Sequence, residues 1–147
     1  MNTIIVDDDQ ATLDIIESFA LNTKVVNLIK KCINAKEASD TLLREKIDLI
    51  FLDVVMPEIN GIEFMSSLQG NMPQVIMIST NDNFAKDAFN LDATDFLVKP
   101  ITYTRFFKAV SKAKKSVKVP PTSTPTSQVT RFSSKICLFY TASIISI

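Results

Sequence analysis

Short apolar runs alternate along the chain with longer segments in which apolar residues recur every three or four positions. The short runs predict strands buried on both faces, and the longer segments predict amphipathic helices. The expected strands cover residues 3–6, 25–29, 48–53, 74–78 and 95–98. The expected helices cover residues 10–21, 35–46, 62–68, 84–91 (or 83–91) and 103–117. Five alternations of strand and helix indicate βαβ units around a parallel sheet.

The helical pattern also predicts which side chains face the sheet. In residues 10–21 the inward stripe contains Leu13, Ile16 and Ala20, and Asp9 is placed to cap the helix. Apolar side chains expected to face inward in the later helices are Ala38, Leu42, Leu43, Ala85, Ala88, Phe89, Phe106, Val110 and Ala113. Phe89 has a second interpretation, because its position also suits a surface that contacts another copy.

Composition and charge exclude several classes of site. The 147 residues suit one domain, and 16 basic residues balance 16 acidic ones, so no net charge favours nucleic acid or an acidic membrane. The absence of histidine excludes histidine-based catalysis and histidine metal ligands. Cys32 and Cys137 lack metal-ligand spacing and are interpreted as free thiols. Without a signal-peptide pattern or an apolar run of about 20 residues, a cytoplasmic protein is expected.

The composition changes near the end of the last expected helix. Residues 119–130 are rich in Pro, Ser and Thr, which is typical of an extended linker. Residues 131–147 form a short apolar tail that is too small to fold alone. We therefore expect one domain at residues 1–118, followed by the linker and the tail.

Polar side chains stand where four of the expected strands end. The first strand is followed by Asp7 and Asp8, the third ends in Asp53, the fourth is followed by Ser79 and Thr80, and the fifth by Lys99. The carboxyl ends of parallel strands lie at one edge of the sheet, where ligands bind in open α/β folds. If the first and third strands are adjacent, these side chains converge on Asp53.

Three aspartates at one edge would repel one another and raise one another's pKa. A hard divalent cation relieves the repulsion, and ligation by oxygen alone suits Mg²⁺. A lysine and a hydroxyl group opposite the metal can bind the remaining oxygens of a phosphoryl group. Asp53 is the natural nucleophile, because an aspartate can form an acyl phosphate. Taken singly, the same residues are ordinary caps, turns and surface charges, so the hypothesis depends on their convergence.

Four motifs together resemble the receiver domain of two-component response regulators. They are residues 5–9 (IVDDD), 52–61 (LDVVMPEING), 79–80 (ST) and 96–100 (FLVKP), and the likeness spans residues 3–117. The resemblance implies a flavodoxin-like, doubly wound (βα)5 fold with a five-stranded parallel sheet in the order 2-1-3-4-5. It implies a phospho-accepting signalling switch, whose only catalysis is its own phosphotransfer and dephosphorylation.

The resemblance also assigns the phosphoacceptor and the metal ligands. It implies that Asp53 is phosphorylated by a sensor histidine kinase. It implies that Mg²⁺ is bound by Asp8, by Asp53 and by the backbone carbonyl of Val55, with Asp7 acting mainly through water.

The phosphoryl-binding and switch residues follow from the same resemblance. They are Ser79, Thr80, Lys99 and Phe96, with Ser79 as the switch hydroxyl. Phe96 is the aromatic side chain that turns inward when the domain is phosphorylated. The bond between Lys99 and Pro100 is expected to be cis, which X–Pro bonds allow.

A narrower likeness, at residues 83–89 and 93–101, is to receivers of the LytTR class. Those regulators usually carry a DNA-binding β-domain after a linker. The tail at residues 131–147 does not resemble the start of that domain, so a truncated or frameshifted output domain and a stand-alone protein stay open. DNA is an expected partner only if an output domain follows in the full-length gene. A homodimer through the fourth helix, fifth strand and fifth helix is also expected, and a membrane partner is not.

Two enzymatic alternatives are less favoured. A phosphatase with an aspartyl nucleophile on a similar α/β fold commonly needs a second aspartate two residues later as general acid. That position is Val55. A nucleotide-binding Rossmann domain needs a glycine-rich turn after the first strand, and the chain has only Gly61 and Gly70.

Overall fold

The computed structural model describes residues 1–68, 70 and 72–117, so the expected linker and tail lie outside the described residues. Its strands are β1 (Asn2–Val6), β2 (Asn27–Cys32), β3 (Leu49–Asp53), β4 (Gln74–Ser79) and β5 (Asp95–Val98). Its helices are α1 (Gln10–Leu21), α2 (Ala35–Arg44), α3 (Gly61–Ser67), the 3₁₀ turn η1 (Asp82–Phe84), α4 (Ala85–Asn90) and α5 (Tyr103–Val117). Within these residues, no helix is long and apolar enough to span a membrane.

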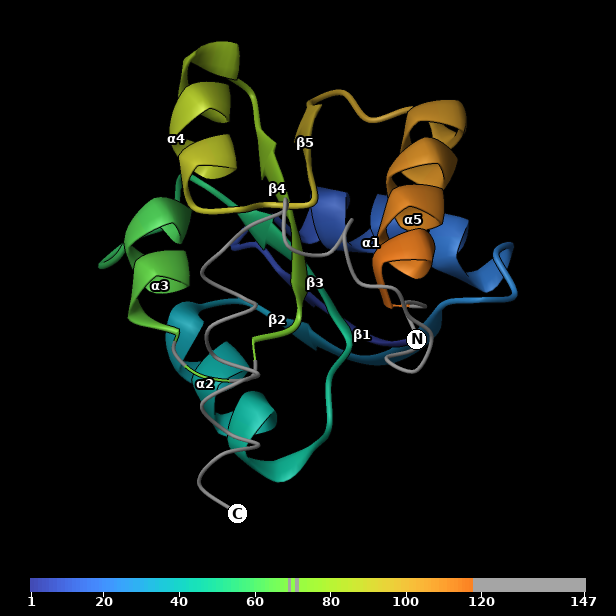
Figure 1. Ribbon diagram of the computed structural model, residues 1–147, viewed down its shortest axis with the longest axis horizontal. Coiled ribbons are helices and arrows are strands. Elements are labelled where there is room, and N and C mark those ends of the chain that lie inside the picture. Colours follow the sequence, from blue (N-terminus) through green and yellow to red (C-terminus); the bar gives the residue numbers. More distant parts are fainter. Residues whose placement is uncertain (69, 71, 118–147) are drawn as a thin grey trace, which may run out of the picture.

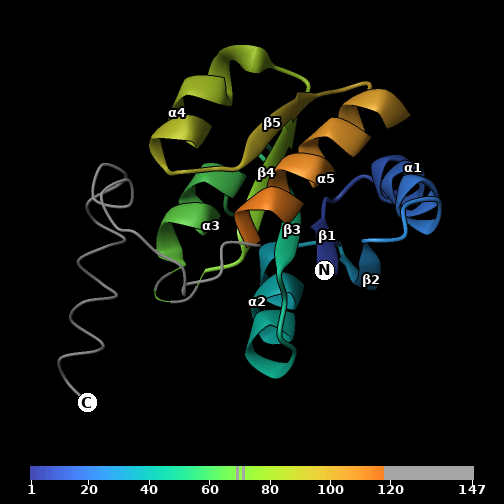
Figure 2. The ribbon, with the colours of Figure 1, turned by 45° about the vertical axis from the view of Figure 1, so that its right-hand side comes forward.

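The strands form one sheet in the order β2-β1-β3-β4-β5, and every neighbouring pair is parallel. Helices α1 and α5 cover one face, while α2, α3 and α4 cover the other (Figures 1 and 2). This confirms the predicted doubly wound fold and its strand order. It also places the carboxyl ends of β1, β3 and β4 side by side.

Each face of the sheet has its own apolar core. Alternate residues of the inner strands point to opposite faces, so Ile50 packs under α2 to α4 and Phe51 packs under α1 and α5. On the second face, the rings of Phe51 and Phe106 stack with centroids 5.1 Å apart, and Phe106 is fully buried. Burial on both faces explains why β3 appears in the sequence as one continuous apolar run.

The second strand differs from its prediction. It was expected at residues 25–29 but spans Asn27–Cys32, because a turn closed by the hydrogen bond from Val26 N–H to Thr23 O occupies the start. We expected the lysines after residue 29 to end the strand. As an edge strand, β2 instead tolerates them, and Lys31 Nζ lies 2.7 Å from Glu17 Oε1 on α1.

Two expectations about helix faces were also wrong. Leu43 is 86% exposed, because α2 buries Ala38 and Thr41 and Leu43 lies on the side away from them. Phe89 is 50% exposed, because the short α4 buries Ala88 instead. For Phe89, the exposed position agrees with the second interpretation of that residue.

Candidate metal centre

Three carboxylates meet where the adjacent strands β1 and β3 end. Val6 pairs with Leu52 in the sheet, so Asp7, Asp8 and Asp53 are delivered to the same edge. One carboxylate oxygen of each residue lies within 4.8 Å of one from each of the other two. Asp7 is fully buried and Asp53 is 4% exposed, whereas Asp8 is exposed. The predicted convergence is therefore present, with one carboxylate facing solvent.

Lys99 reaches the cluster from the loop after β5. Its Nζ donates a hydrogen bond of 2.9 Å to Asp7 Oδ2 and lies 3.6 Å from Asp53 Oδ1. The Lys99 N–H donates to Ser79 O at 2.8 Å, which fixes the backbone beside the end of β4. The following bond, from Lys99 to Pro100, is cis as expected. One ammonium group thus faces two buried carboxylates.

The fourth strand contributes a hydroxyl group at the same edge. Ser79 ends β4 and is fully buried, and its Oγ accepts a hydrogen bond of 3.0 Å from Asn81 N–H. Thr80, the next residue, is exposed. Of the two expected hydroxyls, the structure therefore buries only the first.

Phe96 already lies inward. Its side chain is 6% exposed and belongs to the apolar core that also contains Ala88 and Ala93. Burial of the apolar ring stabilises this inward position, which is the one that the resemblance implies for the phosphorylated domain.

The loop after Asp53 approaches the strand end very closely. Gly61 N–H donates a hydrogen bond of 2.7 Å to Val54 O, and Val54 N–H donates one of 2.8 Å to Ile78 O. A Cβ atom on Gly61 would overlap the carbonyl oxygen of Asp53. Only glycine fits there, and Asn60 then caps α3 through a capping box with Glu63.

Burial controls the electrostatics of the site. Burial raises the pKa of Asp53 to about 7, and the negative charges of Asp7 and Asp8 add to this effect, while Lys99 and the Val55 amide oppose it. Burial alone would lower the pKa of Lys99, but its hydrogen bond to Asp7 and the charge of Asp53 raise it overall. The cluster therefore has more negative charge than its lysine neutralises.

These residues fit a hard divalent cation. The donor set consists only of oxygen atoms, and Mg²⁺ is usually held by one or two carboxylates together with water and phosphate oxygens. Burial and the charges of Asp7 and Asp8 both raise the pKa of Asp53, so a cation bound beside these carboxylates would favour its ionised form. Asp7, Asp8 and Asp53 are the residues that would hold such an ion, either directly or through water.

Asp9, the last residue of the first motif, has a structural role. Asp9 caps α1 as expected, since its carboxylate accepts hydrogen bonds from Ala11 N–H and from Thr12 Oγ1. These bonds, of which the one from the Thr12 side chain has the largest effect, lower the pKa of Asp9.

The sequence did not predict the ion pair that Asp95 and Arg105 form beside Phe96. Asp95 lies on β5 and Arg105 lies ten residues later on α5, so no local sequence pattern predicts that they pair.

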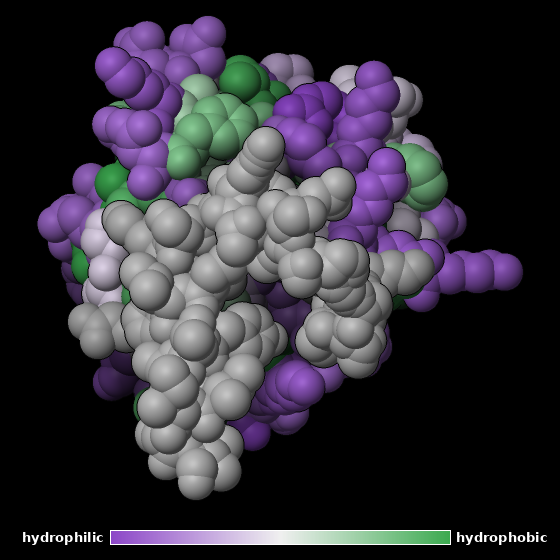
Figure 3. Space-filling view, viewed as in Figure 1, coloured by the Kyte–Doolittle hydropathy of each residue, from purple (hydrophilic) through white to green (hydrophobic). Residues whose placement is uncertain are grey.

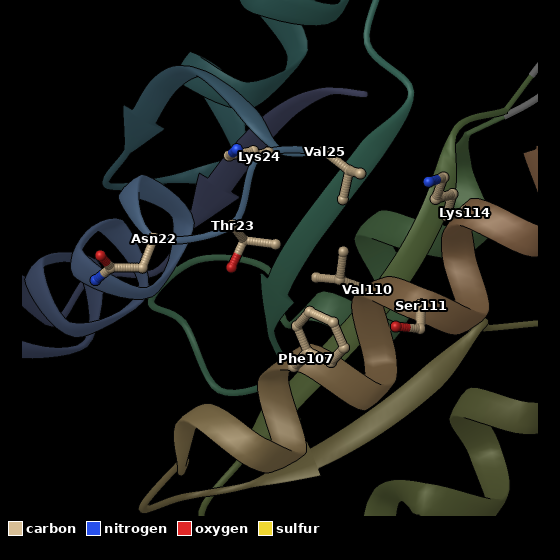
Figure 4. A pocket seen from close by; sticks show the side chains of 8 residues that line it. All are labelled: Asn22, Thr23, Lys24, Val25, Phe107, Val110, Ser111 and Lys114. Carbon is tan, nitrogen blue, oxygen red and sulfur yellow. The ribbon is translucent and has the colours of Figure 1, made fainter.

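A separate cavity of about 410 Å³ lies between the turn after α1 and the outer part of α5 (Figure 4). Its lining includes Thr23, Val25, Phe107 and Val110, and no carboxylate. It therefore has neither the ligands nor the position of the acidic cluster.

Comparison with known proteins identifies the family and supports the fold. A sequence profile described as "Response regulator receiver domain" matches residues 3–111. An "Uncharacterized response regulatory protein" of Shewanella oneidensis is 33% identical over 115 residues, which are 78% of this chain and 49% of that protein. The "Sensory transduction protein LytR" of Staphylococcus haemolyticus is 32% identical over 119 residues, which are 80% of this chain and 46% of that protein.

A solved structure agrees with the fold. The response regulatory domain of protein mrkE from Klebsiella pneumoniae superimposes with a TM-score of 0.73 at 22% identity, over 79% of this chain and 97% of that domain. The chain spans about half the length of the curated relatives it matches.

Proposed function

Because this chain belongs to the response regulator receiver family, we propose that Asp53 accepts a phosphoryl group from a sensor histidine kinase, with Mg²⁺ bound beside it. An Asp53 carboxylate oxygen forms a bond to phosphorus as the phosphorus–nitrogen bond of the kinase phosphohistidine breaks. The imidazole nitrogen keeps the bonding electrons and takes up a proton. The product is an acyl phosphate on Asp53.

The observation that carries the proposal is the position of Asp53 between an acidic pair and a lysine. Asp53 is buried at the end of β3, and its Oδ1 lies 3.6 Å from Lys99 Nζ. The attacking carboxylate must be ionised, and burial by itself opposes ionisation. Bound Mg²⁺ would supply the missing positive charge and would offset charge on the phosphoryl oxygens.

The other site residues then have distinct roles in the proposal. Asp8 and the Val55 carbonyl complete the metal site, and Asp7 orients Lys99 while it contacts the ion mainly through water. Once Asp53 carries the phosphoryl group, the Lys99 ammonium group binds one of the phosphoryl oxygens. The Ser79 hydroxyl binds another phosphoryl oxygen, and Thr80 contributes to the same phosphoryl-binding site.

Phe96 and the surface around it would carry the signal onward. In the proposal, Ser79 moves toward the phosphoryl group and stabilises the inward position of Phe96, which shifts a pre-existing equilibrium. Nearby, Phe89 is 50% exposed and Val98 is 44% exposed. Apolar side chains reach the surface between α4 and α5 (Figure 3). We therefore propose that two copies associate through α4, β5 and α5.

The proposal extends to the organisation of the protein. The receiver domain occupies residues 1–118, a linker residues 119–130, and a tail residues 131–147. The kinase partner acts in the cytoplasm. DNA is contacted only through an output domain, as the greater length of the LytR relative allows.

The direct test is labelling of the full chain with acetyl phosphate and Mg²⁺, followed by intact-mass measurement. We expect one added phosphoryl group that is labile to hydroxylamine, and none without Mg²⁺. The matched variant Asp53→Asn changes one atom of the side chain and should not be labelled. Equal labelling of Asp53→Asn would refute the assignment.

An aspartyl-nucleophile phosphatase is the alternative function. The position two residues after Asp53 is Val55, whose side chain is 58% exposed and has no proton to donate. Turnover of a small phosphate ester beyond one equivalent per chain would support that alternative. A single equivalent, released slowly, agrees with the switch.

A further inference from the structure

An ion pair between Asp95 and Arg105 lies beside the last strand of the sheet, outside the acidic cluster. Asp95 begins β5 and is 3% exposed, and its two carboxylate oxygens accept hydrogen bonds of 2.8 Å from the Arg105 guanidinium group. Lys112 Nζ lies 3.5 Å from Asp95 Oδ1 and adds a second positive charge. Bidentate pairs of this type fix geometry as well as charge. We call Asp95 and Arg105 the β5 clamp.

The β5 clamp also binds both backbone polar groups of Phe96. The Phe96 N–H donates a hydrogen bond of 2.8 Å to Asp95 Oδ1. The Phe96 carbonyl accepts one of 3.2 Å from Arg105. Among the residues that the structure describes, β5 is an edge strand, so these two groups have no neighbouring strand there on that side. The clamp therefore holds the Phe96 backbone on the side that faces away from β4, while pairing with β4 holds the strand on the other side.

A fixed Phe96 backbone limits the positions that its ring can adopt. With both backbone groups held, the side chain points into the core that contains Ala88 and Ala93. Three residues further on, Lys99 contacts Asp7 and approaches Asp53. The same short strand thus has the β5 clamp at its start and the site lysine just after its end.

We propose that Arg105 is a positioning residue of the switch: by holding the Phe96 backbone, it favours the inward ring and so strengthens binding of the phosphoryl group at Asp53. The inference rests on the proposed function. Its physical basis is linkage, because a contact that favours the conformation preferred by a ligand raises the affinity of that ligand by up to the factor by which it shifts the equilibrium. Arg105 acts through Phe96 and does not touch the phosphoryl group.

The test measures binding of beryllium trifluoride, a mimic of the phosphoryl group, to the full chain with saturating Mg²⁺. We expect Arg105→Ala to weaken this binding about five- to tenfold, within the usual range of coupling between sites. Hydrogen exchange at the Phe96 amide should become at least about tenfold faster, because its acceptor Asp95 loses its partner. Arg105→Lys keeps the charge but not the two-pronged geometry, so intermediate values are expected.

Two control variants separate positioning from general stability. Lys108→Ala removes an exposed positive charge from α5 and should leave both measurements unchanged. Val110→Ala loosens the packing of α5 in the other core, so it lowers the unfolding temperature without touching Phe96. Well below that temperature it should bind beryllium trifluoride like the wild type.

The outcomes distinguish the inference from the function on which it rests. If the unaltered chain neither binds beryllium trifluoride nor is phosphorylated, the proposed function fails. If the unaltered chain binds it and the Arg105 variants bind equally well, or no more weakly than Val110→Ala, the clamp is structural and the inference is wrong. Should Arg105→Ala not fold, Arg105→Lys and Asp95→Asn provide the same comparison.

Discussion

Among single residues, Asp53 is a carboxylate that the fold buries almost completely. Its pKa is raised from 3.8 to about 7, chiefly by burial. A carboxyl group whose pKa is higher in the folded than in the unfolded chain stabilises the fold at low pH. That contribution is complete below about pH 4 and is lost as the pH rises to about 7.

Replacing Asp53 by Asn should therefore stabilise the metal-free protein at pH 7.5 by about 1–3 kcal/mol, since a neutral side chain of the same shape avoids the cost of ionisation. Urea unfolding in EDTA, repeated at pH 5 and pH 7.5, measures this difference in free energy. The gain should shrink at the lower pH. A loss of stability at pH 7.5 would mean that Lys99 already compensates the charge fully.

Gly61 offers a second test at the scale of one residue. In Gly61→Ala, the added carbon would collide with the backbone of Asp53, where no flexible side chain can move aside. We expect a loss of about 2–4 kcal/mol in unfolding free energy, and slower labelling by acetyl phosphate.

Gly70 is the matched control for that change. It has a positive φ of 77°, but nothing lies within 4 Å of an added Cβ. Gly70→Ala should therefore cost only the backbone strain, about 1 kcal/mol, and should leave labelling unchanged. Equal effects of the two changes would contradict the close contact at Gly61.

Among the elements, strands buried on both faces were the easiest to predict from sequence. The continuous apolar runs of β3 and β4 reflect cores on both sides of the sheet, and their polar ends coincide because the strands are parallel. The edge strand β2 was misplaced because its residues are mostly half-exposed, so hydrophobicity does not mark its ends. Pairing with β1, which no local pattern contains, decides its bounds.

The end of α4 allows a prediction about one element. Asp92 has a positive φ of 66° just after the helix, and Ala93 N–H donates a hydrogen bond of 3.0 Å to Ala88 O across that turn. Glycine adopts this conformation without a steric penalty, so Asp92→Gly should stabilise the fold by about 0.5–1 kcal/mol. Thermal unfolding measures the change. Asp92→Val should be destabilising, and the reverse order would argue against the left-handed turn.

For the whole molecule, the acidic cluster should link stability to metal. At a free Mg²⁺ concentration about 100 times its dissociation constant, the folded state gains about 2.7 kcal/mol. We expect calorimetry to show a higher unfolding temperature with Mg²⁺ at pH 7.5. The effect should be smaller at pH 5, where a proton competes for Asp53. Asp8→Asn should lose most of the effect, and an undiminished shift in that variant would exclude Asp8 as a ligand.

The site as a whole was more predictable than the contacts that support it. Asp7, Asp8, Asp53, Ser79 and Lys99 each lie at or just after the carboxyl end of a strand, so a parallel sheet with β1 beside β3 is enough to gather them. The inward position of Phe96 and the pairing of Asp95 with Arg105 depend on how α4 and α5 lie on the sheet. That arrangement is a property of packing between distant segments, which one sequence does not reveal.

The β5 clamp should protect the edge of the sheet from aggregation with other chains. An open edge strand invites another chain to extend the sheet, which can lead to fibres. At Phe96 both backbone groups are already occupied by the ion pair, and β5 has only four residues. Two copies that associate at this edge should therefore contact each other through side chains and form a dimer, not a fibre. Because charged side chains lie at this edge, salt should weaken that dimer. Loss of Arg105 would uncover the edge, so that variant should precipitate more readily on prolonged warming.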